Sequence, residues 1–102
     1  METKDVINNL INFRDERGWA KYHNLESLSR ALSIEASEVE KIFLWKNYDA
    51  ELDVQERNDL KLEIADVLIY AYFMCEEMGL DPNEIITEKM AINRNRYWEI
   101  DE

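Results

Sequence analysis

Turn-forming residues are scarce in this chain of 102 residues, which contains only two glycines and one proline. A β-sheet protein of this length needs many tight turns, whereas long helices need few connections. Apolar residues recur at spacings of three and four, which is the period of an amphipathic helix. The sequence therefore predicts an all-α fold, organised as a single domain over residues 1–102.

The helical periodicity and the few helix breakers divide the chain into four segments. We expect helices over about residues 3–17, 25–44, 54–78 and 82–97. Asn24 and Asp81 precede the second and fourth segments as N-caps, while Gly18 and Gly79 follow the first and third. Four helices of this length in one small domain predict a four-helix bundle.

The third segment is apolar on every side over residues 67–75. Because one small bundle can hardly cover such a helix, we expect a homo-oligomer. Nine apolar residues fall well short of the roughly 20 that span a membrane, and the N-terminus does not resemble a signal peptide. Cys75 lies in this run and is interpreted as a buried apolar residue. We expect a soluble, cytoplasmic protein without a membrane partner.

The net charge of −11 restricts the partners of the chain. A negative surface repels nucleic-acid backbones and anionic membranes, so a nucleic-acid polymer is not an expected partner. A phosphorylated small molecule can still bind if a divalent cation mediates the contact.

Two pairs of carboxylates are embedded in apolar surroundings. Glu35 and Glu38 interrupt an apolar stripe of the second segment, and Glu63 and Asp66 stand where the apolar run of the third begins. Four carboxylates converging on one pocket would repel one another unless a cation neutralised them. Oxygen ligands without cysteine favour Mg²⁺ or Mn²⁺. The alternative is that both pairs are solvated helix-surface positions.

Cationic and aromatic residues supply the other parts of a possible nucleotide site. Lys89, Asn93 and Arg96 follow one another at helical spacing and could hold phosphate oxygens, or simply oppose the helix dipole. Trp19, His23 and Trp45 could flank a planar base. Their alternative roles are core packing, a dimer contact or, for His23, hydrogen-bonded scaffolding.

Taken together, these motifs resemble the MazG-like branch of the all-α nucleoside triphosphate pyrophosphatases, especially the dCTP-pyrophosphatase type. The resemblance spans nearly the whole chain and rests on residues 13–19 (FRDERGW) with His23, 35–38 (EASE) with 43–45 (FLW), 63–70 (EIADVLIY) and 89–97 (KMAINRNRY). It implies an oligomeric four-helix bundle of that type, as a homodimer or homotetramer. It also implies Mg²⁺-dependent hydrolysis of a (d)NTP to (d)NMP and pyrophosphate.

The resemblance also implies roles for individual residues. The expected Mg²⁺ ligands are Glu35, Glu38, Glu63 and Asp66. The candidates for holding phosphates and sugar are Lys89, Asn93, Arg96 and Tyr97. The residues expected to shape the base pocket are Trp19, His23, Trp45 and Tyr70. Glu38 is our first choice for the general base because it lies on the stripe between Glu35 and Trp45.

Two departures from the family pattern leave the base preference open. Trp98 follows Arg96-Tyr97 where relatives often have proline, and Leu10 is apolar where some dCTP-specific relatives are polar. The substrate could be dCTP or a modified nucleotide. The main alternative function is a non-catalytic helical module of the same fold that uses its acidic face to bind another protein.

Overall fold

Four α-helices make up most of the computed structural model, which describes residues 1–47 and 51–96. They are α1 (Thr3–Glu16), α2 (Leu25–Lys41), α3 (Val54–Met78) and α4 (Pro82–Arg94), with a short 3₁₀ helix, η1 (Ala20–Tyr22), between α1 and α2. No strand occurs within the described ranges. The prediction of an all-α fold with four helices is confirmed.

The helix ends follow from capping chemistry in the sequence. Asn24 Oδ1 accepts a hydrogen bond from the backbone N–H of Ser27 at 2.8 Å, and Asp81 Oδ1 accepts one from Asn83 at 2.8 Å. At the end of α3, Gly79 adopts a left-handed conformation with φ +67°. These caps fix the start of α2, the end of α3 and the start of α4 where the sequence predicts them.

Helix α2 ends at Lys41, three residues before the expected boundary. Backbone N–H groups of the next three residues bond to carbonyls three positions back, which tightens the chain into a turn. Trp45 then has a φ of +70°, which a right-handed helix cannot accommodate. The tighter turn and this left-handed residue explain the early end.

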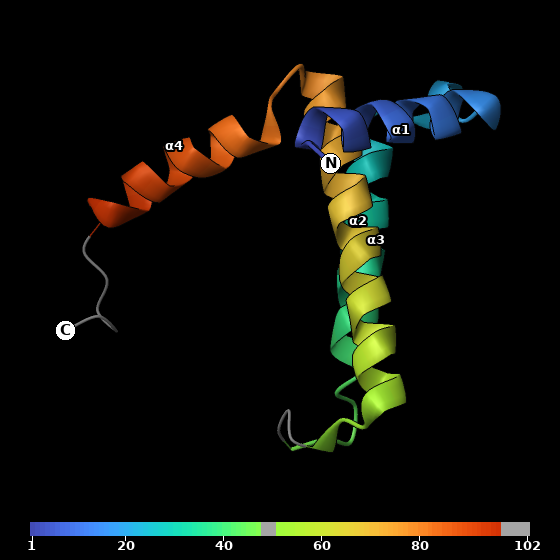
Figure 1. The fold of residues 1–102 in the computed structure, drawn as a ribbon, viewed down its shortest axis with the longest axis vertical. Coiled ribbons are helices and arrows are strands. Elements are labelled where there is room, and N and C mark those ends of the chain that lie inside the picture. The colour runs from blue at the N-terminus through green and yellow to red at the C-terminus, as the bar shows by residue number, and fades with distance from the viewer. Residues whose placement is uncertain (48–50, 97–102) are drawn as a thin grey trace.

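Helices α2 and α3 lie side by side and antiparallel, and they form the principal packed unit of the chain (Figure 1). Leu28 of α2 and Phe73 of α3 are buried, with 2% and 5% of their surface exposed. Helix α1 crosses the C-terminal half of α3 (Figure 1). Val6 and Leu10 of α1 share one groove with Ile69 and Tyr72 of α3.

Helix α4 leaves the end of α3 and extends away from the α2–α3 pair (Figure 1). The radius of gyration is 16.5 Å, whereas a compact domain of this length has one of about 13 Å. Ile86 and Met90 of α4 each remain 53% exposed. The four expected helices are present, but within one chain α4 does not close them into a bundle.

The apolar face of α3 is only partly covered. Leu62 and Leu68 are 54% and 50% exposed, although Phe73 and Cys75 of the same helix are buried. Burial raises the pKa of the Cys75 thiol, as does the nearby negative charge of Asp81. Among the described residues, no helix combines the length and the hydropathy that crossing a membrane would require.

Candidate active site

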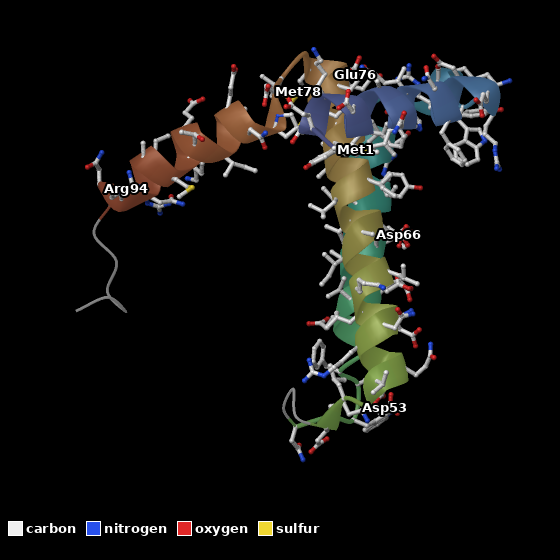
Figure 2. All side chains as sticks on the ribbon, in the orientation of Figure 1. Met1, Asp53, Asp66, Glu76, Met78 and Arg94 are labelled. Carbon is white, nitrogen blue, oxygen red and sulfur yellow. The ribbon has the colours of Figure 1, made fainter. Side chains whose placement is uncertain are left out.

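Three carboxylates converge at the middle of the α2–α3 pair. Glu35 comes from α2, and Glu63 and Asp66 come from α3, where a spacing of three places them on one helix face. One carboxylate oxygen from each residue lies within 4.8 Å of one from the others, and all three side chains are partly buried. Figure 2 shows Asp66 near the midpoint of α3. The antiparallel pairing of α2 and α3 thus brings Glu35 close to Glu63 and Asp66, which lie 28 or more positions further along the chain.

The cluster concentrates negative charge. Burial raises the pKa of Glu35, and the charges of Asp66, Glu63 and Glu38 raise it further. The metal-free site therefore resists full ionisation of Glu35, and either a proton or a cation relieves the repulsion.

The donor set fits a hard divalent cation. All three donors are carboxylate oxygens, the ligand type that Mg²⁺ and Mn²⁺ prefer. The three carboxylate oxygens lie within 4.8 Å of one another, so side-chain movements could bring them to a single ion.

Glu38 lies beside this three-residue cluster, not within it. Its Oε1 accepts a hydrogen bond from Lys41 Nζ at 3.1 Å. Glu38 and Lys41 line a hollow of about 280 Å³ together with Asp59 and Glu63. Because Glu63 also belongs to the carboxylate cluster, this hollow adjoins it.

A larger, mainly apolar cavity of about 510 Å³ also borders the cluster. Its lining includes three of the four predicted base-pocket residues, Trp19, His23 and Tyr70, together with Asp66. The ring centroids of His23 and Phe73 are 4.5 Å apart, edge to face. The carboxylate cluster and the aromatic cavity thus share Asp66.

His23 lines the same cavity and carries a buried ring nitrogen. Its Nδ1 is buried and has no hydrogen-bond partner among the described residues. Burial lowers the pKa of His23, the Arg14 charge lowers it further, and only the Glu77 carboxylate opposes them. Burial and the Arg14 charge thus favour the neutral form of the imidazole.

The structure does not bring every predicted site residue to this centre. Trp45 lies beyond the end of α2 and is 91% exposed. Lys89 and Asn93 lie on α4, and Arg96 follows it, on the segment that extends away from α3. Figure 2 shows Arg94 at the far end of α4, well apart from Asp66. Tyr97 lies outside the described residues.

Other residues, outside the predicted set, also line the two cavities. Phe13 and Leu10 of α1 line the aromatic cavity. Lys41 and Asp59 face the smaller hollow. The spacing of three between Glu38 and Lys41 is the sequence signal that could have indicated their ion pair.

Known proteins resemble this chain over most of its length. The model of the MazG-like family matches residues 31–102. A solved structure of a pyrophosphatase from Archaeoglobus fulgidus gives a TM-score of 0.83 at 36% identity, and the match covers 92% of this chain and 90% of that one.

Two curated relatives are nucleotide hydrolases by name. dCTP pyrophosphatase 1 from Rattus norvegicus is 37% identical over 90 residues, a match that covers 83% of this chain and 52% of the relative. A dATP/dGTP diphosphohydrolase from Cyanophage S-2L is 46% identical over 48 residues, covering 47% of this chain and 46% of that protein. The chain spans about half the length of these curated relatives. Since the family match takes in the greater part of the sequence and the structural match nearly all of it, the chain belongs to the MazG-like family.

Proposed function

We propose that this chain is a Mg²⁺-dependent nucleoside triphosphate pyrophosphohydrolase, which converts a (d)NTP and water to (d)NMP and pyrophosphate. The observation that carries the proposal is the convergence of Glu35, Glu63 and Asp66 at the edge of an aromatic cavity. A nucleotide needs this combination of a phosphate-binding centre and an apolar pocket for a planar base. The relatives are named as pyrophosphatases or as a diphosphohydrolase, and these names support the same reaction class.

The proposed metal ligands are Glu35, Glu63 and Asp66, with Glu38 as the fourth. Mg²⁺ is the proposed ion and Mn²⁺ a substitute, because the donors are carboxylate oxygens. When bound, the ion supplies neutralising charge for the triphosphate and acidifies a coordinated water.

Glu38 is also the proposed general base. It lies one helical turn from Glu35 and outside the tight cluster, in a position from which its carboxylate could accept a proton from the attacking water. In the proposed reaction, the water oxygen bonds to phosphorus as the α–β anhydride bond breaks. The bonding electron pair leaves with pyrophosphate, and the proton of the water passes to Glu38.

The aromatic cavity is the proposed base pocket. Trp19 and Tyr70 offer rings for stacking, and the imidazole of His23 lines the same pocket. dCTP, dATP and dGTP are the first candidates because they occur in the names of relatives. Modified nucleotides are the second group.

A second copy of the chain is proposed to complete the site. The groups proposed to hold the phosphates and sugar are Lys89, Asn93, Arg96 and Tyr97, and the first three belong to the segment that extends away from the cluster of its own chain. In a homodimer or homotetramer, this segment and Trp45 can reach the site of a neighbouring copy. The half-exposed Leu62, Leu68 and Met90 supply apolar surface for that association.

The test is product analysis on a panel of canonical and modified nucleotides, with Mg²⁺ and with EDTA. We expect monophosphate and pyrophosphate in equal amounts, and no reaction with EDTA. The fastest substrate identifies the preferred base. If the folded, metal-loaded protein leaves every nucleotide intact, the proposal fails, and a non-catalytic interaction module becomes the better account of the acidic face.

A further inference from the structure

Lys41 stands next to the carboxylate cluster and has no role in the proposed reaction so far. It is the last residue of α2, and its Nζ lies 3.1 Å from Glu38 Oε1. The two side chains are 65% and 39% exposed. An exposed ion pair with this helical spacing is weak, so a stronger anion can displace Glu38 from Lys41.

The surroundings of Lys41 show where such an anion would sit. Two cavities described above share a carboxylate with the cluster, one through Asp66 and one through Glu63. Of the lysine and arginine side chains in the described part of the chain, only Lys41 lines either of these cavities. Its ammonium group therefore faces the same hollow as Glu63, beside the place where the metal and the triphosphate are expected.

Electrostatic attraction favours the movement of Lys41 from Glu38 to a phosphate oxygen. A triphosphate carries several negative charges, and a hydrogen bond from an ammonium group to a phosphate oxygen is stronger than a weak, solvated ion pair. The basic residues of α4 extend away from this position in the same chain. Among the described lysines and arginines, Lys41 is thus the one that a single chain presents to a phosphate beside the cluster.

We propose that Lys41 is a phosphate-binding residue that holds Glu38 in the free protein and passes to a phosphate oxygen when the nucleotide binds. This exchange frees the Glu38 carboxylate for the metal and for the proton of the attacking water, so the general base is uncovered only when substrate arrives. The inference rests on the proposed function, and it adds a positioning role for a residue outside the four carboxylates.

Two binding measurements on Lys41→Met test the exchange without relying on turnover. The first is Mn²⁺ affinity in the absence of nucleotide, followed by electron paramagnetic resonance. Removing the competitor for Glu38 should tighten Mn²⁺ binding by about threefold. The second is calorimetric binding of inorganic tripolyphosphate in the presence of Mg²⁺, which should weaken by about tenfold or more because a charge-assisted hydrogen bond is lost.

Lys61→Met is the matched control. Lys61 is exposed on α3 and lines neither cavity, and its replacement changes the net charge by the same amount. We expect Mn²⁺ and tripolyphosphate binding in this variant to stay close to the wild-type values. Circular dichroism on all three proteins checks that each is folded.

The outcomes separate the two proposals. If wild type binds Mn²⁺ but Lys41→Met matches Lys61→Met in both measurements, the role of Lys41 is wrong while the proposed function stands. If both affinities weaken in Lys41→Met, the residue binds phosphate but does not compete for Glu38, and the exchange is overturned. If wild type binds neither Mn²⁺ nor tripolyphosphate, the metal centre fails and the exchange fails with it.

Discussion

Glu35 is the residue at which the charge of the cluster is most evident. Burial first, and then the charges of Asp66, Glu63 and Glu38, raise its pKa, so the metal-free folded protein holds a proton there more tightly than the unfolded chain does. The stability that this proton contributes is fully present below the ordinary pKa of 4.5 and is lost as the pH rises through the raised value.

Glu35→Gln cannot ionise and should avoid that loss. In metal-free urea unfolding, we expect the free energy of unfolding of this variant to rise relative to wild type as the pH increases from 4 to 7. Glu40→Gln, an exposed change on the same helix, is the control because it alters the net charge equally. Identical pH dependence in the two variants would contradict the account of Glu35.

A substitution of Trp19 tests whether the aromatic cavity binds the base of the nucleotide. It is 39% exposed, and its ring packs edge-on against Phe13 at a centroid distance of 5.4 Å. If a base stacks on Trp19, Trp19→Ala should raise KM for the nucleotide about tenfold, since such stacking contributes about 1–3 kcal/mol. Tripolyphosphate binding, which involves no base, should be unchanged.

Tyr22→Ala provides the comparison for Trp19. Tyr22 is 64% exposed on the neighbouring 3₁₀ helix and does not line the cavity. We expect its KM to stay near wild type in steady-state assays. Equal increases in KM for the two variants would mean that the cavity does not hold the base.

At the scale of one element, α3 depends on its N-terminal cap. Asp53 Oδ1 accepts a hydrogen bond from the N–H of Glu56 at 2.8 Å, and Glu56 Oε1 accepts one in return from the N–H of Asp53 at 3.1 Å. Asp53→Ala should lower the free energy of unfolding by about 1 kcal/mol. Asn58→Ala, an exposed change inside the helix, should not destabilise the protein in the same denaturation experiment. A loss of the same size in both variants would contradict the capping account.

Local chemistry explains why the helices could be predicted from the sequence. The bounds of α3 follow from Asp53 and Gly79, and those caps are visible in the sequence. The early end of α2 was not predictable in the same way, because a left-handed Trp45 breaks the usual preference for glycine or asparagine in that conformation. The spacing of Glu63 and Asp66 places them on one face, but their approach to Glu35 depends on how α2 packs against α3.

At the scale of the whole molecule, the direction of α4 separates two halves of the proposed site. The carboxylates lie midway along the α2–α3 pair, whereas Lys89 lies on a helix that extends away from it. No helical periodicity indicates whether a helix folds back on its own chain or onto a neighbour. The sequence could therefore suggest candidate members of the site, but not whether one chain or two supply them.

Mixing two inactive variants tests whether neighbouring copies share a site. Glu63→Gln removes a carboxylate of the cluster and Lys89→Met removes a cation of α4, so each should abolish most pyrophosphate release alone. After mixed refolding of a two-fold symmetric dimer, about a quarter of the sites should carry neither change, and activity should recover to that extent. If mixing restores nothing although the subunits have exchanged, α4 acts on its own chain.

The most direct test of the central claim compares wild type with Glu63→Gln and Glu76→Gln on the fastest nucleotide in Mg²⁺. Glu76 is an exposed residue of α3 outside the cluster. We predict equal amounts of monophosphate and pyrophosphate from wild type and Glu76→Gln, and a rate lower by about 100-fold in Glu63→Gln. A wild-type rate in Glu63→Gln, or diphosphate and orthophosphate as products, would contradict hydrolysis at the carboxylate cluster.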